Sequence, residues 1–138
     1  MLPNPEHRQT LLDGDRTALF YYPAKKIIHS EIRAFILGDE FRGLLEKGFD
    51  AVVKFGAHKW LSDDRGYYSL SEEDGHWADT DWSPRMIAAG WKSWAVVMPT
   101  KVIGQMHLRR WIKKYADRGV TVHPFSTPDE AYAWLDGQ

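Results

Sequence analysis

From residue 38 onward, segments with helical periodicity alternate with short apolar runs, and this alternation most constrains the fold. The apolar runs lie at residues 58–61, 93–98 and 120–125, and a helix-like segment precedes each of them. The first helix-like segment, residues 38–55, repeats its apolar residues with the period of one helix face. Strands that alternate with helices pair in parallel through right-handed crossovers. We therefore expect a parallel sheet flanked by helices in this part of the chain.

The front of the chain has a different pattern. Residues 18–22 and 26–31 are strand-like and are separated by a turn that begins at Pro23, which is typical of a β-hairpin; a further short strand is expected at 10–12. The pattern of strands and helices therefore predicts that residues 9–138 form one α/β domain. Its sheet is expected to be mixed and mostly parallel, with an N-terminal antiparallel hairpin and about four flanking helices. Residues 1–8 contain two prolines and no periodicity, so we expect a loose N-terminal arm there.

Composition removes several classes of protein. The 138 residues suit one domain and contain no cysteine, which excludes disulfides, thiolate chemistry and cysteine-based zinc sites and fits a cytoplasmic protein. No run approaches the ~20 apolar residues of a membrane span, and the first residues do not resemble a signal peptide. With a net charge of −1, the chain is not expected to bind nucleic acid or membranes by charge.

Tryptophan is concentrated in residues 59–99, which hold five of the seven tryptophans. A helix is expected from Ser71 as N-cap to about residue 81, and a second one from Ser83 with Pro84 in its first turn. The segment 77–91 is therefore predicted to be a broken helix with a bend at residues 82–83. Two interpretations stay open: the tryptophans belong to the core, or some of them bind a partner or an apolar ligand. The candidates for binding are Trp60, Trp77, Trp82 and Trp91.

A polar group follows the strand expected at 58–61. Ser62, Asp63, Asp64 and Arg65 lie at the carboxyl end of that strand, where open α/β sheets place ligands and partners. The alternative is a turn held by carboxylate-to-backbone hydrogen bonds. Arg85, in the first turn of the second helix piece, opposes the helix dipole, so we expect it to pair with a carboxylate or to stack on a tryptophan. The candidate carboxylates are Asp63, Asp64 and Asp81.

Catalytic and metal-binding motifs are not evident. Ser62 has no neighbouring base and no G-x-S-x-G context, and the histidines do not have zinc-site spacing. We therefore predict no catalytic residue, no metal site and no cofactor, and an enzyme is the weakest of the functions considered.

Four stretches carry a family resemblance: IIHSEIRAFILGDEFRGLLEKG, KWLSDDR, DWSPRMIAAGWKSWAVVMP and FSTPDEAYAWL. They resemble STAS-like domains of the SpoIIAA-like type, small bacterial cytosolic domains related to anti-sigma-factor antagonists. The resemblance implies a mixed sheet flanked by helices and a role in protein–protein regulation without catalysis. In the antagonists an Asp-Ser pair follows the strand and its serine is phosphorylated. Here the order is Ser62-Asp63 with a second acid behind it, so the phosphoswitch is not expected to carry over.

Two functions follow from these patterns. The first is a non-enzymatic regulatory domain that binds a protein partner through residues 62–65 and the broken helix 77–91. The alternative is a binding module for a small apolar ligand in a tryptophan-lined cleft, as in the distantly related CRAL-TRIO fold. Residues 63–81 hold seven acids against one arginine, and residues 101–118 hold six basic residues against one acid. This complementary charge predicts a homodimer, which light scattering at low and high salt would detect.

Overall fold

Six strands form one mixed sheet in the computed structural model, which describes residues 2–4 and 7–138. The strand order follows the sequence, β1 to β6. The first three strands pair antiparallel and the last three continue the sheet in parallel from β3, which confirms the predicted mixed sheet and hairpin. The strands are β1 (Gln9–Asp13), β2 (Thr17–Tyr22), β3 (Ile27–Ile32), β4 (Lys59–Asp63), β5 (Ser93–Val97) and β6 (Thr121–Phe125).

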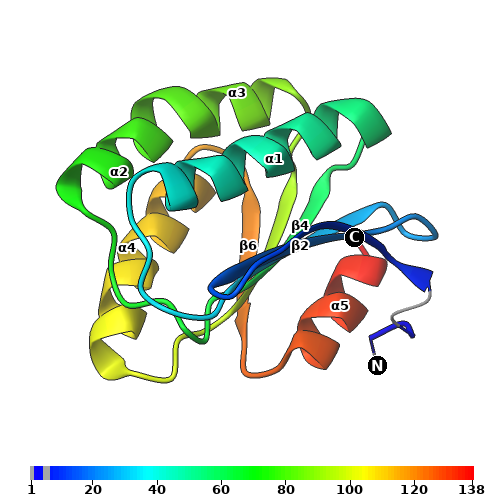
Figure 1. Cartoon of the computed structure of the whole chain (residues 1–138). Helices are drawn as coiled ribbons and strands as arrows, with labels where there is room; N and C mark the ends of the chain where they lie inside the picture. Colours follow the sequence, from blue (N-terminus) through cyan, green and yellow to red (C-terminus); the bar gives the residue numbers. More distant parts are fainter. Residues whose placement is uncertain (1, 5–6) are drawn as a thin grey trace.

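Helices cover both faces of the sheet unequally (Figure 1). One face carries α1 (Asp39–Phe55), α4 (Val102–Asp117) and a continuous helical segment made of α2 (Glu72–Trp77), η2 (Ala78–Trp82) and α3 (Ser83–Ala88). The other face carries α5 (Pro128–Asp136) alone. The larger core therefore lies under α1 to α4, and among the described residues no helix other than α5 covers the opposite face.

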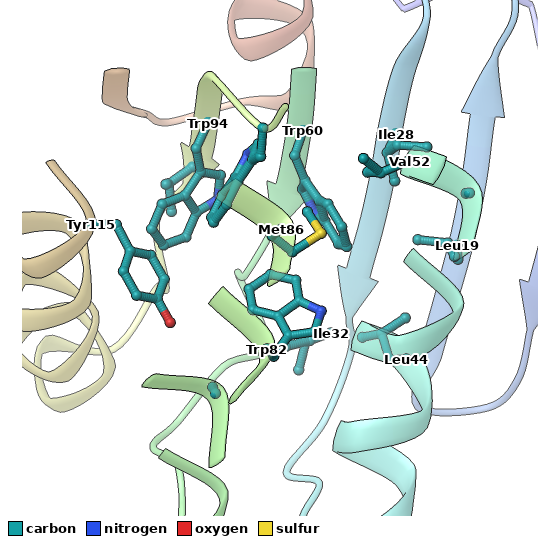
Figure 2. Packing of buried hydrophobic residues seen from close by; sticks show 14 of the residues in the cluster. Leu19, Ile28, Ile32, Leu44, Val52, Trp60, Trp82, Met86, Trp94 and Tyr115 are labelled. Atoms are coloured by element: carbon teal, nitrogen blue, oxygen red, sulfur yellow. The ribbon is translucent and has the colours of Figure 1, made fainter. Parts of the chain in front are cut away.

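The two central tryptophans confirm the predicted strand neighbours. Trp60 of β4 lies beside Trp94 of β5 in the parallel register, and both side chains are buried. Figure 2 shows both rings pointing into the larger core. Gly48 inside α1 packs directly on Trp60: a Cβ on Gly48 would lie 2.0 Å from the Trp60 ring. Glycine therefore lets α1 approach the sheet closely enough to cover Trp60.

The N-cap predicted at Ser71 is confirmed, and two other helix ends are capped by local contacts. The Ser71 side chain accepts a hydrogen bond from the backbone N–H of Asp74, and Thr127 caps α5 in the same way. Gly56 ends α1 with φ of 63°, the left-handed conformation that glycine adopts without strain. Local capping therefore marks the start of α2 and α5 and the end of α1.

The bend predicted at residues 82–83 is wrong. Ser83 does not cap a new helix, because Trp82 before it is already helical and the Ser83 N–H bonds to the carbonyl of Ala78. This five-residue spacing is a π turn, and it lets the helix continue into Pro84, which has no N–H and would clash in a regular turn. The Ser83 hydroxyl donates back to the carbonyl of Asp79.

Strand β4 is longer than expected. Ser62 and Asp63 belong to the strand, opposite Val96 and Val97 of β5, so the loop begins only at Asp64. The arm predicted at residues 1–8 lies partly outside the described residues, since Met1, Pro5 and Glu6 are not among them. Its Leu2 N–H donates to the Asp129 carboxylate of α5. Within the described ranges, no helix combines the length and the apolar character that a membrane crossing requires.

Candidate functional site

A cavity of about 80 Å³ lies between the sheet and the helices α1 to α4. Nearly half of the residues that line it are aromatic, and Figure 2 shows several of the rings around it. The volume is about half of the roughly 150 Å³ that admits a benzene molecule in an engineered protein cavity. It accommodates a small molecule or the end of an apolar chain. The aromatic residues that line it are Phe41, Trp60, Tyr67, Trp82, Trp91, Trp94, Trp111 and Tyr115.

The aromatic walls are held rigidly. The Trp60 and Trp82 rings meet edge to face at 5.6 Å, and Trp91 and Trp94 continue the series at 5.7 Å. Each of these four indole N–H groups donates to an oxygen; Trp60, for example, donates to the Ser30 hydroxyl at 2.9 Å. Because buried indole N–H groups need partners, these bonds fix the rings as the frame of the cavity.

A buried polar chain forms one side of the cavity. The Trp94 indole donates to the Ser62 hydroxyl at 2.7 Å, and that hydroxyl donates to the Asp64 carboxylate at 2.9 Å. Burial raises the pKa of Asp64 to about 7, an effect that the Ser62 bond opposes and the Asp63 charge reinforces. The Ser62 hydroxyl is thus engaged on both sides and buried, which does not fit the phosphorylated serine of the antagonists.

Tyr67 adds an unsatisfied polar group. Its side chain lines the cavity and is buried, and its hydroxyl has no hydrogen-bond partner among the described residues. Burial raises the pKa of this hydroxyl, so it remains protonated. A buried hydroxyl without a partner costs free energy, and a bound molecule or water with a polar atom would remove that cost.

Exposed apolar side chains gather at the carboxyl ends of the parallel strands, where three loops meet. The N–H of Gly66 bonds to the end of β3 through the Ile32 carbonyl, and the N–H of Thr100 bonds to the Arg65 carbonyl. Figure 1 shows these loops at one end of the molecule. Six of the seven large apolar side chains exposed among the described residues belong here. We call this set the apolar rim: Phe35, Leu37, Tyr68, Val102, Ile103 and Met106.

The opposite face of the sheet carries a charged cluster. Arg65 binds both carboxylate oxygens of Asp63, at 2.9 and 2.7 Å. His29 of β3 is buried beside them, and its Nδ1 lies 2.9 Å from the hydroxyl of Tyr22. Burial lowers the pKa of His29 to about 4, so the imidazole is neutral at pH 7.

The structure separates the predicted site residues into groups. Trp60, Ser62, Asp64, Trp82 and Trp91 line the cavity together. Asp63 and Arg65 lie on the other face, because successive residues of a strand point to opposite sides. Their assignment to a binding site stays a prediction.

Two further predicted residues lie outside the cavity. Trp77 packs edge to face with Phe41, and the Arg42 guanidinium lies 5.3 Å from its ring. Arg85 pairs with Asp81 at 2.8 Å, one of the three carboxylates considered in the sequence analysis. It also pairs with Glu46 at 2.5 Å. Its guanidinium lies over the ring of Phe49 instead of a tryptophan. Both of its carboxylate partners are about half exposed, so these pairs contribute little to stability.

The sequence analysis did not identify several residues of the cavity and of the charged cluster on the opposite face. Ser30 lies directly opposite Ser62 in the register of β3 and β4, and aligning the two strands would have paired these serines. The other residues missed were His29, Glu31, Tyr67, Trp111 and Tyr115.

The acidic and basic segments also meet within one chain, since Asp79 pairs with Lys114 and Arg118. The homodimer expected from their complementarity stays a prediction.

Comparison with known proteins supports the fold. No protein-family model and no curated protein matches the sequence. Among solved structures, the chain is similar to one from Thermotoga maritima described as a "putative anti-sigma factor antagonist". The two share 15% sequence identity at a TM-score of 0.53, over 79% of this chain and 86% of that chain. The likeness confirms the STAS-like fold that the resemblance implied.

Proposed function

We propose that this chain is a non-enzymatic interaction domain that binds a protein partner on the apolar rim. The observation that carries the proposal is the concentration of exposed apolar side chains there: Val102, Ile103 and Met106 are 69%, 51% and 60% exposed. Exposed apolar side chains that gather at one end of a folded chain mark an interaction surface more often than singly scattered ones do. The rim also lies at the carboxyl ends of parallel strands, the usual position of sites in open α/β sheets.

The surroundings of the rim indicate the chemistry of the partner. Arg110 borders the same shallow hollow as Val102, Ile103 and Met106, and Arg109 and Lys113 are exposed on the same helix. Lys101 lies 5.3 Å from the ring of Tyr68. A partner segment with apolar side chains flanked by carboxylates matches both the apolar contact and the positive charge. The similar solved structure is described as a "putative anti-sigma factor antagonist", a description that implies a protein target.

The partner proposal is tested by placing a charge on the rim. Met106→Glu should abolish recovery of the specific partner when the chain is affinity-purified from its own cells and analysed by mass spectrometry. The fold should remain intact because the Met106 side chain is 60% exposed. Val53→Glu is the matched control, since Val53 is 61% exposed on α1 away from the rim. Equal partner recovery with both variants would contradict the proposal.

A second candidate function is binding of a small, largely apolar ligand in the cavity. The specific observation behind it is a pair of buried polar groups with few hydrogen bonds. The Tyr67 hydroxyl has no partner among the described residues, and the Asp64 carboxyl accepts a side-chain hydrogen bond from Ser62. Both groups cost stability in an empty cavity, and a ligand with one polar atom would satisfy them. The rigid rings around them would hold its apolar part.

Ethanol is a suitable probe for the cavity, because it is smaller than benzene and combines an apolar end with one hydroxyl. In NMR titrations, the indole N–H signals of Trp60 and Trp94 should shift saturably with ethanol and much less with xenon, which has no polar atom. Ala78 lines the cavity and is buried, so Ala78→Leu should fill the space and remove the shifts. Signals that never move in the wild-type chain, or that move equally in Ala78→Leu, would rule the cavity out as a ligand site.

A further inference from the structure

Three potential metal ligands converge on the face of the sheet that carries α5. His29 and Glu31 are two residues apart on β3, and Asp63 lies opposite Glu31 on β4, so all three side chains project from the same face. One ligand atom from each lies within 4.8 Å of the other two. His29 is 1% exposed, whereas the Glu31 side chain is 22% exposed and leaves the cluster open to solvent.

The buried imidazole of His29 offers one nitrogen to this cluster. Its Nε2 is buried without a hydrogen-bond partner among the described residues and lies 3.8 Å from Oε1 of Glu31. Its Nδ1 lies 2.9 Å from the Tyr22 hydroxyl, so when Nδ1 carries the proton it donates to that oxygen. The Nε2 lone pair then faces carboxylate oxygens, an arrangement that is repulsive until a cation lies between them. Histidines that ligate metals have this second hydrogen bond, which fixes the ring.

The carboxylates are oriented in a way that leaves ligand positions free. Arg33 binds Oε2 of Glu31 through two of its nitrogens, both at 3.0 Å, and leaves Oε1 on the side of His29. Arg65 holds Asp63 in a two-pronged contact. A carboxylate has about four lone-pair positions, so neither arginine exhausts its partner. The arginines thus serve as the outer hydrogen-bonding groups that ligating carboxylates usually have.

We propose that His29, Glu31 and Asp63 bind a divalent first-row transition-metal ion, with Zn²⁺ as the representative. One imidazole nitrogen and two carboxylate oxygens make a three-ligand set that leaves a coordination position open. Tetrahedral zinc with bonds of about 2.0–2.2 Å places its ligand atoms about 3.3–3.6 Å apart. The His29 and Glu31 atoms lie 3.8 Å apart and all three ligand atoms lie within 4.8 Å of one another, so binding requires the side chains to close in, led by the partly exposed Glu31.

The same surroundings disfavour Mg²⁺ and Ca²⁺. Those ions prefer sets of oxygen ligands and rely on the negative charge of the site. Here Arg33 and Arg65 offset the charge of the two carboxylates. The imidazole nitrogen instead suits zinc and its neighbours in the transition series. Selectivity for Zn²⁺ over Mg²⁺ therefore belongs to the proposal.

Calorimetric titration of the untagged full chain with Zn²⁺ tests the site. One ion should bind per chain, and Glu31→Gln, which keeps the shape of the side chain, should weaken the affinity at least about tenfold. Glu46→Gln is the matched control: its carboxylate is also held by an arginine, Arg85, but belongs to no described ligand cluster. This control should bind Zn²⁺ as the wild type does, and Mg²⁺ should not compete.

Nitrogen NMR of the imidazoles separates this site from adventitious binding at other histidines, without relying on a variant. The Nε2 signal of His29 should shift on addition of one equivalent of Zn²⁺, before the signals of exposed histidines such as His76. The proposal is overturned if wild-type chain binds no Zn²⁺, if Glu31→Gln binds it as tightly as wild type, or if another histidine takes the first equivalent.

Discussion

Trp60→Ala should lower the free energy of unfolding by about 3–5 kcal/mol, the range for large aromatic side chains removed from a core. The Trp60 side chain is 3% exposed and its ring contacts those of Trp82 and Trp91. It also fills the space that Gly48 leaves in α1. The substitution would create a hole at the centre of the sheet and leave the Ser30 hydroxyl without its indole partner.

Urea unfolding of the wild type and two variants measures this effect. Trp77→Ala is the comparison, because Trp77 is only partly buried and packs at the edge of the core against Phe41. Its loss should be clearly smaller than that of Trp60→Ala. A loss below about 1 kcal/mol for Trp60→Ala would mean that the central packing described above is wrong.

The second large effect concerns pH. Burial raises the pKa of Asp64 from 3.8 to about 7, so the folded chain holds a proton that the unfolded chain releases. Its contribution to stability is therefore complete below pH 4 and is lost as the pH rises towards 7 and above. At about 1.4 kcal/mol per pKa unit, the total loss is about 4 kcal/mol. Asp64→Asn has no carboxyl proton to lose at this position. As the pH rises from 4 to 8, its free energy of unfolding should therefore increase relative to that of the wild type.

The quantity to measure is the difference in unfolding free energy between wild type and Asp64→Asn from pH 4 to pH 8, with a chelator present. The wild-type curve alone is not sufficient, because His29 contributes the opposite slope. Burial lowers the pKa of His29 to about 4, so its contribution grows as the pH rises towards 6.5. Subtraction cancels this contribution. A difference that stays constant across the range would show that the Asp64 carboxyl is not perturbed in the folded chain.

The elements of the fold were predictable because their signals are local. The period of α1, the Ser71 and Thr127 caps and the turn at Gly56 depend on residues close in sequence. The neighbouring positions of Trp60 and Trp94 followed from two short apolar runs on either side of a helical segment. The π turn was missed because its cause lies in how the helix accommodates Pro84, while Ser83-Pro84 has the composition of a helix start.

The candidate sites were less predictable because they depend on strand faces and register. Residues 62–65 look like one polar group in the sequence, yet β4 extends through Asp63 and sends its side chains to both faces. Ser62 and Asp64 therefore line the cavity, while Asp63 joins His29 and Glu31 on the other side. The apolar rim was missed for a related reason: periodicity identifies apolar residues, but only the packed helices decide which of them remain exposed.

Site-specific photo-cross-linking in the native cell is the most direct test of the proposal that the apolar rim binds a partner. A benzophenone amino acid in place of Met106 should cross-link to one discrete protein, because this side chain is exposed and lines the shallow hollow of the proposed surface. The same group in place of Val53, equally exposed on α1, should give no such product. The same cross-linked protein from both positions, or none from Met106, would contradict the proposal.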